Sequence, residues 1–302
     1  PWGHPLDRTA DETAAIEAAD VVLTVDVRDI GLVRRLGGGG IDAQRQWIDI
    51  TSAPLRDSSW LVTASDAGDA LQLVSDPGAA LAALLDRVPA QTPAQAPAAG
   101  GPAVAETAEP VDPAAGLDKR GIAAAAGAVL PHDRVVVAHG ALAGHARTYL
   151  RLQRPSQYLG RSGGEGLGYA LPASLGAALA HRGSDRVVVA FLTDGDTLYL
   201  PQALWTAARE RIPLLAVIEN NRTYWRDEIH QRAAATERGR DPDVAASGVR
   251  LTEPDIDLAA LARSFGVAAS EPVRTVGQLS TAMAHGLDVV AKGDPFVIEA
   301  IT

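Results

Sequence analysis

The chain has 302 residues, 47% hydrophobic and 21% charged, with a net charge of −10 at pH 7. The length is about twice the ~150 residues that serve as a guide to one domain, so two domains are expected. The negative charge argues against a nucleic-acid or anionic-membrane surface, and the lack of cysteine excludes disulfides, thiolate metal sites and cysteine nucleophiles. With no apolar run near ~20 residues and no signal-like opening segment, a cytoplasmic protein is the default expectation.

Residues 1–88 predict a partial α/β domain. Strands are expected at 21–26, 46–50 and 60–64, and helices at 11–19 and from Pro77 onward, where Asp76 stands at the N-cap and Pro77 at the first helical position. This alternation is too short for a complete doubly wound domain, so a Rossmann-like domain that is truncated, or that the chain enters partway, is expected. Residues 89–113 are rich in Pro, Ala and Gly, which predicts a mobile linker; an ordered surface strap is the alternative.

Residues 114–302 predict a second, larger α/β domain. Helices are expected at 119–130, 166–180, 200–209, 257–265 and 275–289, and strands at 134–138, 186–192, 213–218 and 296–300. Alternation over this length predicts a parallel sheet covered by helices on both faces. Ligands of such sheets bind beyond the carboxyl ends of the strands.

Polar residues follow two strands of this predicted sheet. One strand runs into Thr193-Asp194-Gly195-Asp196, and the next into Asn220-Asn221-Arg222-Thr223. Because one helix separates the strands, their carboxyl ends should lie side by side. A carboxylate from Asp194 and an amide oxygen from Asn221 suit Mg²⁺ or Ca²⁺, which share oxygen ligands with substrate phosphates. Taken singly, either fragment is also explained as a turn or a helix cap.

The spacing of the two fragments resembles that of a known family. Asp194 and Asn221 are 27 positions apart, as in the Gly-Asp-Gly … Asn-Asn fingerprint of thiamine diphosphate (ThDP) enzymes. The upstream Gly-Leu-Gly-Tyr-Ala-Leu-Pro-Ala run at 166–173, the segments at 203–208 and 211–213, and the Pro-Asp-Ile-Asp-Leu-Ala run at 254–259 also resemble the acetolactate synthase and benzoylformate decarboxylase group. The resemblance covers roughly 111–302, the group's diphosphate-binding domain, while 1–88 resemble the C-terminal half of its central domain.

The resemblance implies roles for individual residues. Asp194 and Asn221 would bind Mg²⁺ through their side chains, and Thr223 through its backbone carbonyl. Leu167 would be the apolar wedge that bends the cofactor, and the backbone carbonyl of Glu165 would orient its 4′-amino group. The other residues implied to contact the cofactor are Gly166, Gly168, Gly195, Asp196 and Tyr224.

Some positions depart from the family pattern or stay open. Thr193 replaces the first glycine of the fingerprint. Asp196 replaces a common serine, and a carboxylate beside a diphosphate is unfavourable unless it points away or caps the next helix. Tyr224 and Trp225 would wall the thiazolium or substrate space, with ordinary packing as the alternative. His230 is a possible substrate contact, although a solvated histidine is the simpler interpretation, and 226–228 read as a solvated helix face.

The family's pyrimidine-binding domain, which carries the glutamate that activates the cofactor, has no counterpart in the sequence. The resemblance therefore implies a subunit of a ThDP-dependent carboligase or 2-oxoacid decarboxylase that needs a pyrimidine-domain chain, or a fragment of a longer protein. Pro1 is compatible with removal of an initiator Met, which favours a natural subunit of a hetero- or homo-oligomer. A diketone-cleaving lyase or hydrolase and a catalytically silent homologue are the alternatives.

Overall fold

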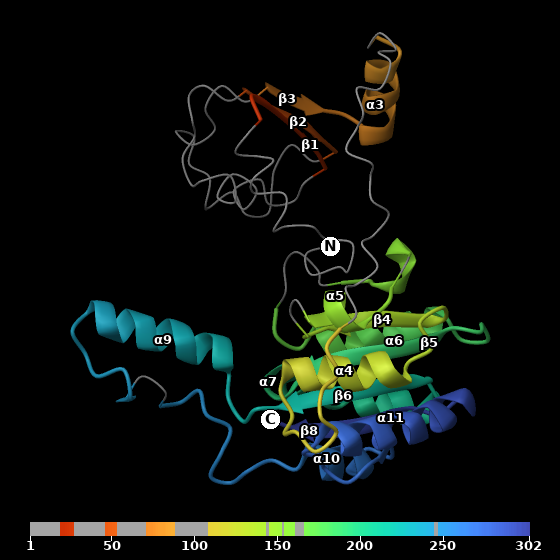
Figure 1. Ribbon diagram of the computed structural model, residues 1–302, viewed down its shortest axis with the longest axis vertical. Helices are drawn as coiled ribbons and strands as arrows, with labels where there is room; N and C mark the ends of the chain where they lie inside the picture. Colours follow the sequence, from red (N-terminus) through yellow and green to blue (C-terminus); the bar gives the residue numbers. More distant parts are fainter. Residues whose placement is uncertain are drawn as a thin grey trace. The chain divides into compact units, whose positions relative to one another are not determined.

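The computed structural model describes residues 19–26, 46–52, 71–87, 108–142, 145–152, 154–160, 166–244 and 247–302 (Figure 1). The described residues fall into two compact units, one before and one after residue 100. The predicted linker at 89–113 lies largely outside the described residues, and the exact domain boundaries stay a prediction.

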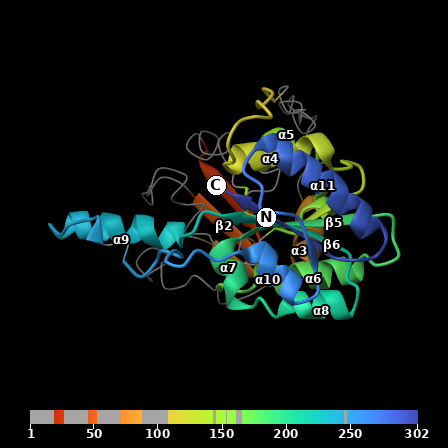
Figure 2. The ribbon, with the colours of Figure 1, turned by 90° about the horizontal axis from the view of Figure 1, so that it is seen from below.

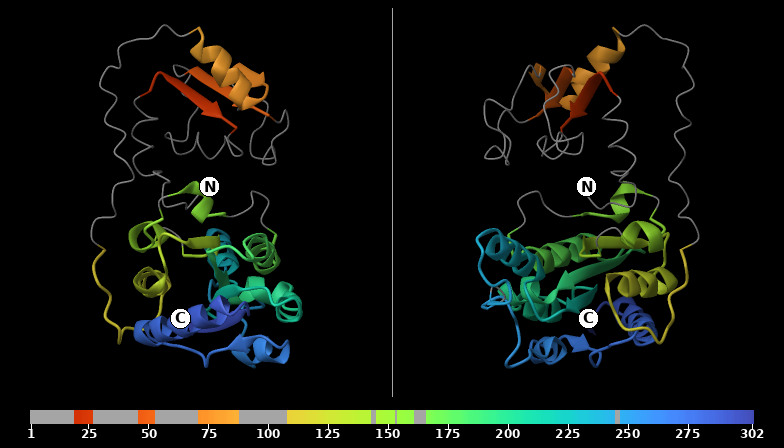
Figure 3. Two further views of the ribbon diagram at one scale, coloured as in Figure 1. Left: turned by 90° about the vertical axis from the view of Figure 1, so that its right-hand side faces the viewer. Right: turned by 60° about the vertical axis from the view of Figure 1, so that its left-hand side comes forward.

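The smaller unit is a three-stranded parallel sheet with one helix. Strands β1 (Val21–Val25), β2 (Gln46–Thr51) and β3 (Leu71–Val74) pair in the order β1-β2-β3. Figure 3 shows helix α3 (Pro77–Leu85) in orange. It begins as predicted, because the Asp76 carboxylate accepts a hydrogen bond from the Ala79 amide at 2.8 Å. The strand expected at 60–64, and all but the last residue of the helix expected at 11–19, lie outside the described residues.

The larger unit contains a five-stranded parallel sheet in the order β4-β5-β6-β8-β7. Its strands are β4 (Val135–Gly140), β5 (Val187–Thr193), β6 (Leu214–Asn220), β7 (Ala268–Ala269) and β8 (Phe296–Ile301). Four of them are the continuous apolar runs of the sequence, which suits strands buried on both faces. The α/β fold class predicted from the sequence is confirmed.

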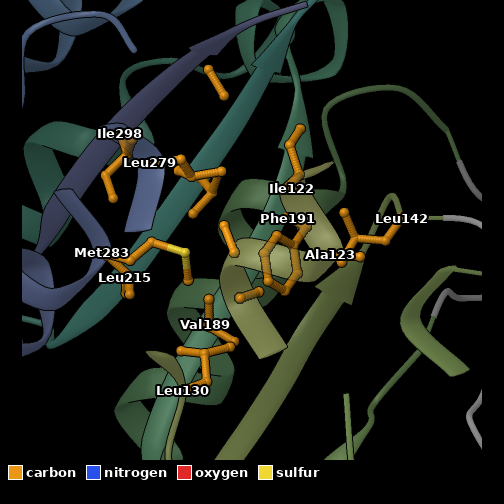
Figure 4. Close-up of a cluster of buried hydrophobic side chains, with 14 of the residues drawn as sticks. Ile122, Ala123, Leu130, Leu142, Val189, Phe191, Leu215, Leu279, Met283 and Ile298 are labelled. Atoms are coloured by element: carbon orange, nitrogen blue, oxygen red, sulfur yellow. The ribbon is translucent and has the colours of Figure 1, made fainter. Parts of the chain in front are cut away.

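Helices cover both faces of this sheet (Figure 2). One layer holds α4 (Lys119–Val129), α5 (His145–Tyr149) and α11 (Val276–Ala291), and the other holds α6 (Ala170–Ala180), α8 (Ala203–Arg209) and α10 (Leu258–Ser264). On the first face, Phe191 and Leu215 of the strands pack with Ile122 of α4 and Met283 of α11 (Figure 4). A second cluster fills the opposite face. The two cores hold the strand ends in fixed register.

The sequence did not predict β3, β7 or α5. Three further differences from the sequence prediction lie near the carboxyl edge of the larger sheet. The helix expected from residue 166 begins at Ala170, because Gly166–Tyr169 form a turn in which Gly168 has φ +91°. A short helix, α7 (Asp194–Tyr199), begins directly at the end of β5, where a loop was expected. Helix α9 (Trp225–Glu237) follows β6 and projects away from the sheet layers (Figure 1). None of the helices in the described part of the chain is long and apolar enough to cross a membrane.

Candidate functional site

The carboxyl ends of β5 and β6 meet, as the sequence predicts. Thr193 pairs with Glu219 in the parallel register, and the next residues are Asp194, the first residue of α7, and Asn220, the last residue of β6. The backbone N–H of Arg222 donates a hydrogen bond to Asp194 Oδ2 at 2.6 Å. The two polar fragments, 27 positions apart in the sequence, therefore share a hydrogen bond in the structure.

Asp194 is a buried carboxylate that accepts hydrogen bonds from backbone amides. Its Oδ1 accepts a hydrogen bond from the Gly195 N–H at 2.7 Å, and its Oδ2 the bond from Arg222. Burial raises the pKa of Asp194, although the hydrogen bonds from Gly195 and Arg222 act in the opposite direction. A carboxylate whose negative charge is disfavoured by burial is suited to a nearby cation, which would compensate that charge.

The loop after β6 is held in one conformation by its own polar groups and by a distant segment. Asn221 Oδ1 accepts the N–H of Thr223 at 3.1 Å, and Arg222 adopts φ +58° between them. The Tyr224 N–H donates to the Val249 carbonyl at 2.9 Å, and the Leu251 N–H donates to the Arg222 carbonyl at 2.8 Å. Hydrogen bonds therefore hold residues 221–224 in place. They are called the metal loop below, because the sequence predicts metal ligands there.

Two buried glutamates that sequence analysis did not single out lie behind this loop. Glu219 is paired with Lys119 Nζ at 3.3 Å, and burial raises the pKa of Glu219 against the opposing effect of Lys119. Glu299 of β8 accepts a hydrogen bond from Asn220 Nδ2 at 2.6 Å. It accepts a second one, at 2.9 Å, from the Ala259 N–H in the first turn of α10. A carboxylate inside an otherwise apolar strand was the available signal for both residues.

The turn that carries Leu167 is tied to α7. The Gly168 N–H donates to Asp196 Oδ1 at 2.8 Å, so this carboxyl oxygen turns toward the glycine turn. Asp196 Oδ2 is buried and has no hydrogen-bond partner among the described residues. Leu167 itself is 49% exposed, as is required of a side chain that would support a bound molecule. Gly166 is also exposed, and Glu165 lies outside the described residues.

Tyr224 closes the space above Gly195. Its ring lies edge-to-face with that of Tyr199, with centroids 6.2 Å apart, and a Cβ atom at position 195 would collide with it. A glycine is therefore needed there for packing within the protein. Burial raises the pKa of Tyr224. Trp225 and His230 are both exposed on α9, Trp225 at its first residue next to the loop and His230 farther along the helix.

The donor set fits a hard cation that brings ligands of its own. Asp194 supplies a carboxylate, Asn221 an amide oxygen and the loop its backbone carbonyls, all oxygen donors of the kind Mg²⁺ prefers. Within the described ranges, no three His, Cys, Asp or Glu side chains are grouped to hold a metal by themselves. Most of a coordination shell would then come from water or from the phosphates of a ligand, as is usual for Mg²⁺.

Comparisons with known proteins point to one family. The model of the "Thiamine pyrophosphate enzyme, C-terminal TPP binding domain" matches residues 138–300. A Mycobacterium tuberculosis protein that carries the name of an acetolactate synthase large subunit is 32% identical over 208 residues, 67% of this chain and 38% of that protein. The benzoylformate decarboxylase of Pseudomonas aeruginosa is 32% identical over 237 residues, 78% of this chain and 40% of that protein.

A solved structure agrees with these matches. The thiamine diphosphate-dependent 4-hydroxybenzoylformate decarboxylase of Rhodococcus jostii RHA1 superposes with a TM-score of 0.69 at 26% identity, covering 100% of this chain and 53% of that one. The chain spans only about two fifths of the length of the curated relatives just described.

Proposed function

Because the chain belongs to the thiamine pyrophosphate enzyme family and carries its C-terminal TPP-binding domain, we propose that it binds ThDP through Mg²⁺ within a 2-oxoacid decarboxylase or carboligase. The observation that carries the proposal is the hydrogen bond between the Arg222 amide and Asp194, which joins the two fragments of the family fingerprint at one sheet edge. When bound, the cofactor supplies an electron sink next to a substrate carbonyl.

The chain's own contribution is to bind and orient. Asp194 and Asn221 present side-chain oxygens to Mg²⁺, and Thr223 its backbone carbonyl. The start of α7 would hold the diphosphate, and Gly195, which has no side chain, would allow its close approach. Asp196 is turned toward Gly168, which supports a role in fixing the Leu167 turn and relieves the repulsion expected between a carboxylate and a diphosphate.

Leu167 and the start of α9 bound the reactive end of the site in this proposal. The exposed side chain of Leu167 would be the apolar support of the cofactor. Tyr224 and Trp225 wall the thiazolium or substrate side, and His230 is a substrate contact only if α9 closes over the site. Glu165 keeps its expected role toward the 4′-amino group as a prediction.

The proposal includes a partner. The relatives are more than twice as long as the matched region, and the residues that activate the cofactor from its pyrimidine side are expected on a domain that this sequence does not contain. A second polypeptide, or the remainder of a longer protein, supplies that domain and its glutamate. Decarboxylation is favoured over diketone cleavage by the decarboxylases among the relatives.

The test is reconstitution. We expect the homogeneous 302-residue chain to turn over neither benzoylformate nor pyruvate with ThDP and Mg²⁺ present. CO₂ release should appear when a chain carrying a pyrimidine-binding domain, such as one encoded beside it, is added. Turnover by the chain alone would contradict the partner requirement. Cofactor binding without turnover of any 2-oxoacid by the assembly would support the silent homologue, and diketone cleavage the alternative enzyme.

A further inference from the structure

One glutamate of α9 is buried although the helix around it is exposed. Helix α9 projects from the sheet layers, and Glu228 and Ala235 are its buried residues (Figure 1 and Figure 2). Glu228 is only 7% exposed. The sequence had suggested a solvated helix face at 226–228, and for Glu228 that prediction is wrong. Burial of a carboxylate is unfavourable unless it is paired and hydrogen-bonded, so its partners need an explanation.

Both oxygens of Glu228 are engaged, and they contact different parts of the chain. Oε1 accepts a hydrogen bond from Arg232 Nε at 3.0 Å, and Arg232 Nη1 also contacts Asp243 at 2.8 Å. Oε2 accepts the hydroxyl of Thr223 at 3.0 Å. The bonds from Arg232 and Thr223 hold the pKa of Glu228 below its usual value. One carboxylate therefore bridges the helix and the metal loop.

We propose that Glu228 is a positioning residue for the metal loop and, through the Thr223 hydroxyl, couples the loop's affinity for Mg²⁺ to the placement of α9. This inference rests on the proposed function, because it concerns the same site. The hydroxyl and the backbone carbonyl belong to one residue, so fixing the Thr223 side chain restricts the direction in which its carbonyl points.

Helix stability alone does not account for the arrangement. A glutamate four residues before an arginine stabilises a helix through that pair, and this requires only Oε1. The bond from Oε2 to Thr223 adds nothing within the helix. Thr223 Oγ1 also lies 3.3 Å from the Val249 carbonyl, but the shorter bond to a charged acceptor is the stronger one.

Coupling between two sites is reciprocal. If Glu228 stabilises the loop conformation that binds Mg²⁺, then Mg²⁺ binding must in turn stabilise the attachment of α9. Helix α9 begins at Trp225, which follows the loop directly. Mg²⁺ binding would therefore also fix the position of the Trp225 side chain.

The test separates metal affinity from cofactor affinity. In the reconstituted assembly, the Mg²⁺ concentration for half-maximal ThDP binding is measured by titration calorimetry for wild type, Thr223→Val, Thr223→Ser, Glu228→Ala and Glu237→Ala. We expect Thr223→Val and Glu228→Ala to need about tenfold more Mg²⁺, consistent with loss of one charge-assisted hydrogen bond. At saturating Mg²⁺ their ThDP affinity should match wild type. Glu237→Ala, which replaces an exposed glutamate of the same helix, should behave as wild type. Thr223→Ser keeps the hydroxyl and should need less Mg²⁺ than Thr223→Val.

A second readout needs no ligand. Amide hydrogen exchange of 221–237 in the ligand-free chain should speed up in Glu228→Ala and stay unchanged in Glu237→Ala. Unaltered Mg²⁺ dependence in Thr223→Val would overturn the coupling. Because Thr223→Val leaves the Glu228–Arg232 pair in place, it tests the coupling even if Glu228→Ala does not fold. Absence of Mg²⁺-dependent binding in wild type would instead refute the proposed function, and the exchange measurement would still decide whether Glu228 holds the loop.

Discussion

Asp194 is the residue on which the two loops converge. Its two carboxyl oxygens accept amide hydrogens from α7 and from the metal loop, so one side chain determines how the ends of β5 and β6 face each other. Burial raises its pKa, which means that the ligand-free fold holds the negative charge at a cost. A divalent cation would remove that cost on binding.

Replacing Asp194 with Ala should therefore abolish Mg²⁺-dependent ThDP binding. The variant loses the charged ligand and leaves the Gly195 amide without its acceptor, while the Arg222 amide keeps only its bond to Asn220 Oδ1. Titration calorimetry on the reconstituted assembly measures the effect. Asp288→Ala, an exposed site on α11, serves as the control and should bind as wild type does. Equal affinity in the Asp194 variant and the control would remove Asp194 from the metal site.

Leu167→Ala should separate binding from cofactor geometry. The metal and diphosphate contacts are untouched, so affinity should fall only modestly. Hydrogen–deuterium exchange at the C2 atom of bound ThDP, followed by NMR after acid quench, should slow, by on the order of 10²-fold if reacting groups are displaced by about 1 Å. Leu179→Ala, a leucine of α6 with a similar 50% exposure, is the matched control. Collapse of binding with unchanged exchange would make Leu167 a packing residue.

At the scale of elements, Glu299 ties three pieces of secondary structure together. Its carboxylate in β8 receives hydrogen bonds from Asn220 at the end of β6 and from the first turn of α10. Asn220 Oδ1 in turn accepts the Arg222 N–H at 3.2 Å, the same amide that contacts Asp194. The position of the metal loop thus depends on a strand eighty residues away in sequence.

Glu299→Ala should destabilise the fold. It removes the acceptor of the Ala259 N–H and leaves the buried Asn220 amide with only a long, 3.5 Å contact to the Ile256 carbonyl. Each buried group that loses its partner costs roughly 1–3 kcal/mol. A loss of about 2–5 kcal/mol in the free energy of unfolding is therefore expected from urea denaturation. Glu271→Ala, which removes an exposed glutamate that pairs with Arg263, should cost less than 1 kcal/mol, as for surface ion pairs in general. Similar losses in the two variants would show that Asn220 and α10 do not depend on Glu299.

At the scale of the whole molecule, the core residues of the five-stranded sheet that the structure describes all lie after position 110. The residues proposed to hold the cofactor also lie there. The larger unit therefore has what it needs to fold by itself.

A chain reduced to residues 108–302 should unfold cooperatively, with a midpoint within a few degrees of the corresponding transition in the full chain. Circular dichroism during heating measures both. A non-cooperative melt of the shortened chain, beside a cooperative one for the full chain, would show that the first hundred residues stabilise the second unit through contacts that the separate cores do not reveal.

The sequence by itself determined β1 and β2, the four long strands of the larger sheet, the polar strand ends and the family, but not the short strands β3 and β7. Buried parallel strands correspond to local apolar runs, and the fingerprint depends on spacing alone. Both can therefore be recognised in the sequence without knowledge of any tertiary contact. Helix α3 could be predicted from Asp76 at its N-cap and Pro77 at its first position. The turn at 166–169 was not predicted, because the positive φ of Gly168 goes with a contact to Asp196 that the sequence does not reveal.

Only the tertiary structure decided which polar side chains are buried and what they bind. Glu228 has the local pattern of a solvated helix residue, yet it is covered because Thr223 and Arg232 converge on it. Glu299 and Asn220 are distant in sequence and meet because β6 and β8 are neighbours in the sheet. Hydropathy is a property of each residue, whereas a buried carboxylate is permitted only by partners that the fold brings to it from elsewhere in the chain.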